Sequence, residues 1–278
     1  MINIFFDYSL IFGHFGFPKL LLEGAAYAAV FAEATSFLLV VIILNVNKLH
    51  KRFNFYESLQ VRTRLLKKII NVSLPLIGQY LINIVCWLVF FLLVENMGQR
   101  ALAVSAIMRS LLGVCGAFIW SFASTTNTMV SNLIGQGRKH EVMQLVGKIT
   151  VLSLSCIIFI SVPILLFPRY FLLLYTDDLS LIAASVPCLY IVLGAVMLMA
   201  VGAVIFSAII GTGCTSVNLK IEVVAISSYI VYIFIVVRVL DLPLFYAWGS
   251  EVVYWLVTLS LSLRYLWSEK WKAKLHYN

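Results

Sequence analysis

The sequence contains few charged residues. Only 12% of its 278 residues are Asp, Glu, Lys or Arg, whereas 62% are apolar. A soluble domain is about one-quarter charged, so this composition excludes an ordinary soluble protein. The apolar residues form long continuous runs, which are typical of membrane-spanning helices rather than of barrel strands. We therefore expect an all-α integral membrane protein.

The sequence also lacks the usual signatures of enzymes and metal sites. Its five cysteines contain no CxxC pair, and its four histidines fall between the apolar runs without the spacing of metal ligands. The GQG and GTG segments follow helices rather than strands, so they do not indicate nucleotide loops. We expect no enzymatic activity, no cofactor and no metal site. Nucleic-acid binding is not expected either, because the net charge of +8 is distributed as membrane topology requires.

Seven apolar runs are long enough to cross a bilayer as helices, which takes about 20 residues. A shorter run, residues 2–12, precedes them and would cover roughly half of a hydrocarbon core. The sequence thus predicts a polytopic helical bundle with seven full spans plus a partial first one. The expected spans are residues 25–45, 72–94, 102–129, 149–167, 181–210, 221–240 and 242–266.

Basic residues between the spans are strongly asymmetric. Fifteen of the 20 fall in alternate connections and in the C-terminal tail, and four fall on the opposite side. By the positive-inside rule, the long loop after the first full span and the C-terminus are expected in the cytoplasm, with the protein in the cell inner membrane.

The same topology makes the N-terminus unusual. The loop GHFGFPKLLLEG is expected outside, so the partial first helix must rise from the cytoplasm and Met1 would lie in mid-membrane. We expect that upstream sequence is missing or that the start is wrongly chosen. The alternative is a short re-entrant N-terminus in an intact protein.

Three stretches carry a resemblance to a known family. NTMVSNLIGQGRKHEV (127–142) and AIIGTGCTSVNLKIE (208–222) each close a span with a glycine turn, and NIFFDYSLIFGHFGFP (3–18) leads into EGAAYAAVFAE (23–33). Their order and spacing resemble the multidrug and toxic compound extrusion (MATE) transporters over nearly the whole chain. In that family, comparable loops recur in each lobe, and an Asn-x-x-x-Asp helix runs into a Gly-Ala-Ala helix.

The resemblance implies a fold of two six-helix lobes, of which this chain would hold the second and the end of the first. Residues 1–45 would be the last one and a half helices of the N-lobe. Residues 46–71 would be a basic cytoplasmic interlobe loop with an interfacial helix, since their apolar residues share one helical face. Residues 72–278 would be a six-helix C-lobe with a basic tail. The missing N-terminal half would then be a possible partner.

Asp7 is the first candidate for chemistry. A carboxylate at this depth costs about 2.5–3.5 kcal/mol, so a functional role is expected by default; the alternative is that Asp7 reaches outside water as a solvated helix residue. Asn3 lies four residues earlier on the same helical face. The resemblance implies that both contribute to a proton or cation site. The following GAAYAA segment places Ala29 where some family members carry a hydroxyl, which is a departure from that site.

Four residues of the expected C-lobe and one of the N-lobe are candidates for a substrate cavity. Gln79, Asn83 and Trp87 recur every four residues as one stripe, which would line the cavity or bond neighbouring helices. Arg109 is a basic residue within a span, and it would face the cavity or extend to the membrane surface. Glu33 lies deep within its span.

Two further acids are expected to be structural. Glu222 is interpreted as the start of a helix, where an acid suits the dipole, and Glu251 as close enough to the outer surface to be hydrated. The resemblance implies acids on the seventh and tenth helices in sodium-coupled members. The matching regions here offer Gln79 or Asn83 and the acid-free CLYIVLGAVMLMAVGAVIF. We therefore expect the C-lobe to lack that cation site.

The leading functional hypothesis is a secondary antiporter that exchanges a small amphipathic, often cationic, molecule for H⁺ or Na⁺ across the lipid bilayer. One alternative is a non-transporting membrane fragment. Another is a lipid-linked oligosaccharide flippase of the same superfamily, for which a basic cavity would be needed. If four and a half helices are missing, the chain alone is not expected to transport.

Overall fold

The computed structural model describes residues 2–48, 63–269 and 271–272. The chain divides into two compact units, residues 1–63 and residues 64–278, which are described separately. Most of the described residues are helical, and none of them forms a strand.

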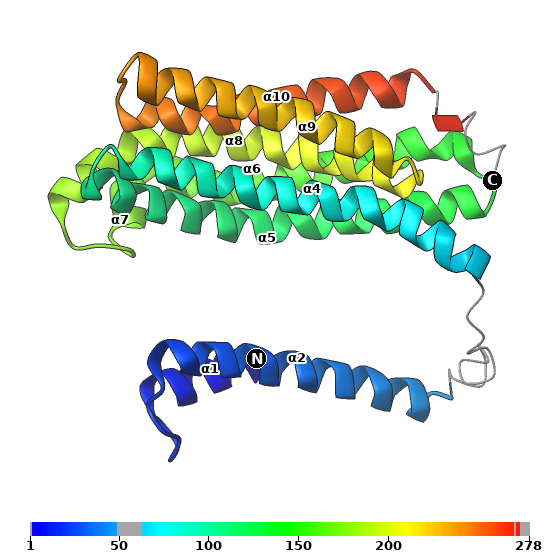
Figure 1. Cartoon of the computed structure of the whole chain (residues 1–278), viewed down its shortest axis with the longest axis horizontal. Helices are drawn as coiled ribbons and strands as arrows, with labels where there is room; N and C mark the ends of the chain where they lie inside the picture. The colour runs from blue at the N-terminus through cyan, green and yellow to red at the C-terminus, as the bar shows by residue number, and fades with distance from the viewer. Residues whose placement is uncertain (1, 49–62, 270, 273–278) are drawn as a thin grey trace. The chain divides into compact units, whose positions relative to one another are not determined.

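The first unit is a pair of helices, α1 (Ile2–Phe12) and α2 (Leu21–Val46) (Figure 1). The Phe6 ring stacks on Phe31 at 5.3 Å, and Leu20 donates its backbone N–H to the Leu10 carbonyl at 2.9 Å. A Cβ atom at Gly24 would lie 2.6 Å from the Leu10 carbonyl oxygen. The glycine therefore allows the two backbones to approach closely where α2 begins.

The second unit is a bundle of long helices that run side by side (Figure 1). Short elements join them: the 3₁₀ turn η1 (Lys139–Glu141), α7 (Pro168–Leu172) and the π-helical turn η2 (Ile235–Val239). The long helices are α4 (Thr63–Glu95), α5 (Gln99–Gly135), α6 (Val142–Leu166), α8 (Leu179–Gly211), α9 (Thr215–Phe234) and α10 (Leu244–Trp267).

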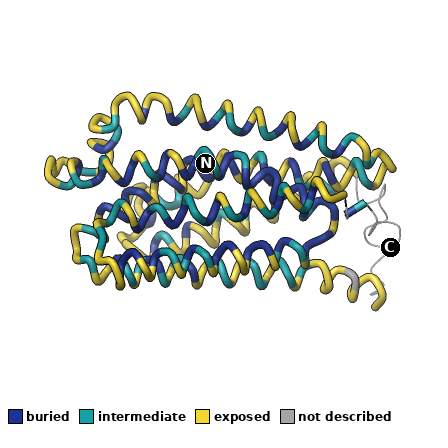
Figure 2. The backbone as a smooth tube through the Cα atoms, turned by 90° about the horizontal axis from the view of Figure 1, so that it is seen from above, coloured by how far each residue is buried: buried dark blue, intermediate teal, exposed yellow. Residues whose placement is uncertain are grey.

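Helix α8 is the centre of this unit. It packs against α5, α6 and α10, and buried residues follow one another along most of its length. The outer helices instead bury one side, as the alternation of buried and exposed turns in Figure 2 shows. An apolar helix without a polar face is expected at such a central position, because it is surrounded by other helices.

The turn before α8 is held by polar contacts. The Asp178 carboxylate caps the helix by accepting from the backbone N–H of Ser180 at 2.8 Å and of Leu181 at 3.3 Å. Hydrogen bonds from the Ser180 side chain and from these two backbone N–H groups favour the ionised form and hold the pKa of Asp178 below its usual range. The cap is therefore formed at neutral pH, and its contribution to stability is lost as the pH falls through that lowered pKa.

Helices α5 and α8 cross closely at Gly211. A Cβ atom there would lie 2.8 Å from the Asn127 carbonyl oxygen and 2.8 Å from Cβ of Val130. The Ser131 hydroxyl donates to the Gly211 carbonyl at 3.0 Å, which fixes the same crossing. This glycine belongs to one of the stretches on which the family resemblance rests, and close backbone packing explains its place.

Replacing Gly211 with alanine is expected to destabilise the second unit by about 1–3 kcal/mol, because the added methyl group overlaps backbone and a β-branched side chain. The measurement is thermal unfolding of the purified chain in detergent. Gly147→Ala is the matched control, since a Cβ atom at Gly147 meets nothing within 4 Å. A melting temperature for Gly211→Ala equal to that of the control would contradict the close crossing.

The prediction of seven full spans is confirmed, since seven helices in the described residues are long and apolar enough to cross a membrane. The short apolar helix Ile2–Phe12 precedes them. The expected interlobe loop lies partly outside the described residues, at positions 49–62. Residues 63–71 of this stretch form the first turns of α4, and their interfacial position stays a prediction.

The expected start of the span at residues 221–240 is wrong by about two turns, because α9 begins at Thr215. The first turns of this helix are polar in sequence but are packed against α8. Asn218 is fully buried and donates its amide to the Phe206 carbonyl at 3.1 Å. Glu222 therefore lies well inside the helix, and its interpretation as a helix-start acid is wrong.

Candidate functional site

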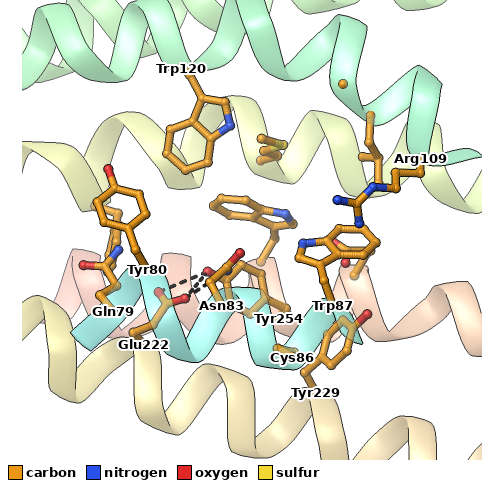
Figure 3. A pocket seen from close by; sticks show the side chains of 16 residues that line it. Gln79, Tyr80, Asn83, Cys86, Trp87, Arg109, Trp120, Glu222, Tyr229 and Tyr254 are labelled. Atoms are coloured by element: carbon orange, nitrogen blue, oxygen red, sulfur yellow. Dashed lines mark hydrogen bonds between the residues drawn. The ribbon is translucent and has the colours of Figure 1, made fainter. Parts of the chain in front are cut away.

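A pocket of about 340 Å³ lies within the second unit, between α4, α5, α8, α9 and α10 (Figure 3). Its walls are largely aromatic, and its polar lining combines two carboxylates, two amides and one guanidinium. The aromatic lining residues are Tyr80, Trp87, Trp120, Phe206, Tyr229, Tyr254 and Trp255.

The polar stripe predicted on α4 faces this pocket. Gln79, Asn83 and Trp87 all line it, as four-residue spacing on one helical face requires. The stripe also bonds a neighbouring helix, since Asn83 donates its amide to Glu222 at 3.3 Å. Both alternatives considered for the stripe, cavity lining and bonding between helices, are therefore realised together.

Arg109 reaches the same pocket from α5. Its guanidinium carbon lies 4.6 Å from the centroid of the Trp87 ring and 5.4 Å from that of Phe91. The residue as a whole is exposed, so Arg109 lines the pocket at its edge while resting on aromatic faces. This stacking holds the guanidinium against the aromatic side chains at the edge of the pocket.

Glu222 forms the centre of the polar network in the pocket. The Tyr254 hydroxyl lies 2.9 Å and 3.1 Å from its two carboxylate oxygens and donates to them, and the Asn83 amide donates as well (Figure 3). The residue is only 1% exposed. These hydrogen bonds hold the Glu222 carboxylate in one orientation. They connect α9, which carries Glu222, to α4 and α10.

Glu251 is also buried, at 6% exposure, and lines the same pocket. The expectation of a hydrated residue near the outer surface is therefore wrong. Its neighbours on α10 explain the burial, because Ala247, Trp248, Tyr254 and Trp255 are buried on the same side of the helix.

The two glutamates also change the expectation for acids in this unit. The sequence offers no acid on the pocket-lining parts of α4 and α8, but α9 and α10 each supply one. A recognisable signal was present in α10, where Ser250, Tyr254, Thr258 and Ser262 recur every four residues. All four are buried, so the polar stripe marks the side that faces the bundle.

The remaining predicted residues lie in the first unit. Asp7 is half-buried, whereas Asn3 and Glu33 are exposed within the described structure. In the described ranges, no hydrogen bond or ion pair joins the Asp7 carboxylate to another side chain. The roles assigned to these three residues remain predictions.

Over residues 2–48, 63–269 and 271–272, no three His, Cys, Asp or Glu side chains are grouped as a metal site would need. All five cysteines are free thiols, and four of them are buried. They act as small packing residues in the bundle.

The family model MatE matches residues 75–237, which is more than half of the chain. The chain belongs to the MatE family. Members of this family are transporters rather than enzymes, and this chain is a multi-pass membrane protein that belongs to it. The match begins within α4 and ends within η2. It includes the whole of α5, α8 and α9, which are three of the five helices around the pocket.

Curated relatives of this MatE protein are named multidrug resistance proteins. The chain is 26% identical over 283 residues to the probable multidrug resistance protein NorM of Thermotoga maritima, covering 98% of this chain and 59% of that protein. It is 27% identical over 183 residues to the protein of the same name from Listeria innocua, covering 64% of this chain and 40% of that protein. The chain thus spans about half of the length of these relatives.

Solved structures show the same fold. A crystal structure of MATE in the straight conformation matches with a TM-score of 0.80 at 16% identity, over 100% of this chain and 61% of that one. The Vibrio cholerae MATE transporter VcmN in its bent form matches with a TM-score of 0.69 at 17% identity, over 75% of this chain and 48% of that one. At these identities the likeness concerns the fold.

Proposed function

We propose that this MatE chain acts in secondary active antiport, in which an amphipathic organic cation leaves the cell in exchange for H⁺ or Na⁺. The protein would lie in the cell membrane with its C-terminus in the cytoplasm, as the asymmetry of its basic residues predicts. The names of the curated relatives support multidrug efflux as the class of activity.

The pocket is the observation that carries this proposal. Aromatic faces attract organic cations, and buried carboxylates neutralise their charge. The pocket has both, with seven aromatic side chains in its walls and Glu222 and Glu251 in its lining. A pocket for a lipid-linked anion would need more basic than acidic residues. The lining instead has two glutamates and one basic residue, Arg109.

We assign the coupling ion to Asp7 and Asn3. A carboxylate within a span is expected to bind a proton or a cation, and an amide one turn away supplies a further oxygen. Antiport follows when the ion and the organic cation favour opposite orientations of one two-state protein. The proposed coupling therefore needs no chemical step beyond binding and release.

The proposed function is tested at the natural locus. Deleting the coding segment is expected to raise the steady-state accumulation of a cationic dye such as ethidium in living cells. Restoring the gene together with its upstream DNA lowers accumulation again, and a protonophore or removal of sodium abolishes that effect. Unchanged accumulation in the deletion strain, for a panel of cationic dyes, would contradict the proposal.

A pocket variant sharpens this test. Trp87→Ala removes an aromatic wall and the face on which Arg109 rests, so the restored strain should accumulate several-fold more dye than wild type. Trp267→Ala is the matched control, because Trp267 is 69% exposed at the end of α10. Equal accumulation in both variants, at equal protein levels in the membrane, would exclude the pocket as the substrate site.

A further inference from the structure

Buried hydroxyl groups continue the polar stripe of α10 beyond the pocket. Thr258 and Ser262 follow Tyr254 at successive steps of four residues, and both are fully buried without lining the pocket. Neither Thr258 Oγ1 nor Ser262 Oγ has a hydrogen-bond partner among the described residues. Buried polar atoms without partners are rare, so these two hydroxyls require an explanation.

The two hydroxyls differ from other buried hydroxyls of the bundle. Thr126 donates to the Phe122 carbonyl at 2.8 Å, and Ser185 donates to the Leu181 carbonyl at 2.9 Å. A serine or threonine within a helix is often satisfied in this way, by the carbonyl four residues earlier. The stripe hydroxyls do not make that bond, so they can bond a group outside their own helix.

Asn218 on α9 is a third polar side chain of this kind. It is fully buried, and its amide N–H donates to the Phe206 carbonyl of α8 at 3.1 Å. Its amide oxygen has no partner among the described residues. An amide oxygen can only accept hydrogen bonds, so this atom needs a donor.

Two contacts show how α9 and α10 are aligned on either side of Asn218. Glu222 accepts from the Tyr254 hydroxyl, and the Tyr265 hydroxyl lies beside the Cys214 thiol. The two helices are therefore antiparallel. A four-residue step from Glu222 toward Cys214 on α9 corresponds to a four-residue step from Tyr254 toward Tyr265 on α10.

This alignment brings the three unpartnered atoms together. One step leads to Asn218 on α9 and to Thr258 on α10, and Ser262 lies one turn further along α10. Helix α8 encloses the group from a third side, because it packs along α10 and its Phe206 carbonyl accepts the Asn218 amide. The group thus lies in the interior, where three helices meet.

The chemistry of the three atoms selects their occupant. None of them bonds another directly, so a small molecule between them must supply the missing bonds. It must donate to the Asn218 oxygen, whereas each hydroxyl can both donate and accept. A water molecule meets these needs, since a buried water makes about three hydrogen bonds to buried polar groups. A metal cation is disfavoured, because no carboxylate lies among the three side chains.

We propose that Asn218, Thr258 and Ser262 bind an ordered water molecule between α8, α9 and α10. The water donates to the Asn218 amide oxygen and bonds the two hydroxyls. The site lies one helical turn beyond Glu222, so the water extends the polar network of the pocket toward the turn between α8 and α9. The site does not depend on the proposed antiport, because it involves neither substrate nor coupling ion.

Thermal unfolding of the purified full chain in detergent tests this site. Thr258→Val keeps the shape of the side chain and removes its hydroxyl. If water is bound, the water loses a partner and the melting temperature falls by a few degrees. If the site is dry, the change removes an unsatisfied hydroxyl, and an equal or higher melting temperature would overturn the proposal.

The matched control is Thr126→Val, the same change at a fully buried threonine whose hydroxyl bonds within its own helix. Its melting temperature should stay close to that of the wild type. A fall equal to that of Thr258→Val would show that loss of any buried threonine hydroxyl has this effect, and would overturn the proposal.

A double variant tests whether one occupant serves both hydroxyls. The decrease in melting temperature for Thr258→Val combined with Ser262→Ala should be smaller than the sum of the two single decreases, because one water is shared. Additive decreases would overturn the proposal. A wild-type melting temperature that is higher in sodium chloride than in choline chloride, with the difference lost in Thr258→Val, would identify a cation instead of water.

A measurement on the wild type keeps the test decisive if the variants do not fold. An experimental density map that resolves buried waters should show a peak within hydrogen-bonding distance of Asn218 Oδ1 and of at least one of the two hydroxyls. A map that shows buried waters elsewhere in the bundle and none here would overturn the proposal.

Discussion

Replacing Trp248 with alanine is expected to destabilise the second unit by about 3–5 kcal/mol, the range for removing a large buried aromatic side chain. Trp248 is fully buried and packs edge-to-face on Phe90, with ring centroids 4.9 Å apart. Its indole N–H donates to the Ser105 hydroxyl at 3.2 Å, and Ser105 is itself fully buried. The substitution therefore leaves a large cavity and removes a buried hydrogen bond between α10 and α5.

Two controls separate these contributions in thermal unfolding of the detergent-purified chain. Trp248→Phe keeps most of the buried surface but removes the N–H donor, so about 1–3 kcal/mol of the loss should remain. Trp267→Ala removes an exposed tryptophan at the other end of α10 and should change the melting temperature little. If Trp248→Ala and Trp267→Ala had the same melting temperature, the burial of Trp248 against α4 and α5 would be wrong.

The second large effect is expected for Asp7→Asn, which should raise dye accumulation in the restored strain to the level of the deletion strain. Asparagine keeps the size and hydrogen-bonding ability of the side chain but cannot exchange a proton or carry the charge that a cation needs. If Asp7 holds the coupling ion, the Asp7→Asn variant still binds its substrate, but the ion gradient no longer drives release of that substrate. Binding of the dye to the purified chain should persist, since the pocket lies in the other unit.

The matched control for this prediction is Glu23→Gln, an exposed acid in the first turn of α2 in the same unit. It should restore efflux as well as the wild type does. Full efflux with Asp7→Asn at normal protein level would exclude Asp7 as the coupling residue. Coupling would then have to be sought at Glu222 and Glu251.

The spans were predictable from composition because a bilayer imposes one length on every apolar helix. The stripe of Gln79, Asn83 and Trp87 was predictable as one face of α4, since helical periodicity decides which residues lie together. The presence of Arg109 in the same pocket was one of two alternatives, and its stacking on Trp87 required the packing of α5 beside α4.

The acids of the pocket were misjudged for a physical reason. The segment Thr215–Lys220 is polar enough to be interpreted as a loop, but it is helical and packs within the bundle, where the Asn218 amide donates to the Phe206 carbonyl. Glu251 lies near the end of a span, where depth alone suggests hydration. Its burial follows from the packing of α10 on α8 and α9, which local sequence does not encode.

A proline precedes a glycine by six residues at the start of two helices, Pro18 before Gly24 in α2 and Pro243 before Gly249 in α10. Gly24 allows α2 to approach the backbone of Leu10, and Gly249 lies against the Tyr232 hydroxyl, 2.6 Å from the position that a Cβ atom would take. Both glycines serve close packing at the beginning of a helix.

The central claim is antiport of an organic cation against an ion gradient, and transport in membrane vesicles tests it most directly. Inside-out vesicles from the natural host and from its deletion strain are given either a pH gradient, acidic inside, or a sodium gradient, and ethidium uptake is followed. The account predicts that one of the two gradients drives uptake only in vesicles that contain the chain, and that Asp7→Asn abolishes it. Equal uptake in both kinds of vesicle under both gradients would contradict the account.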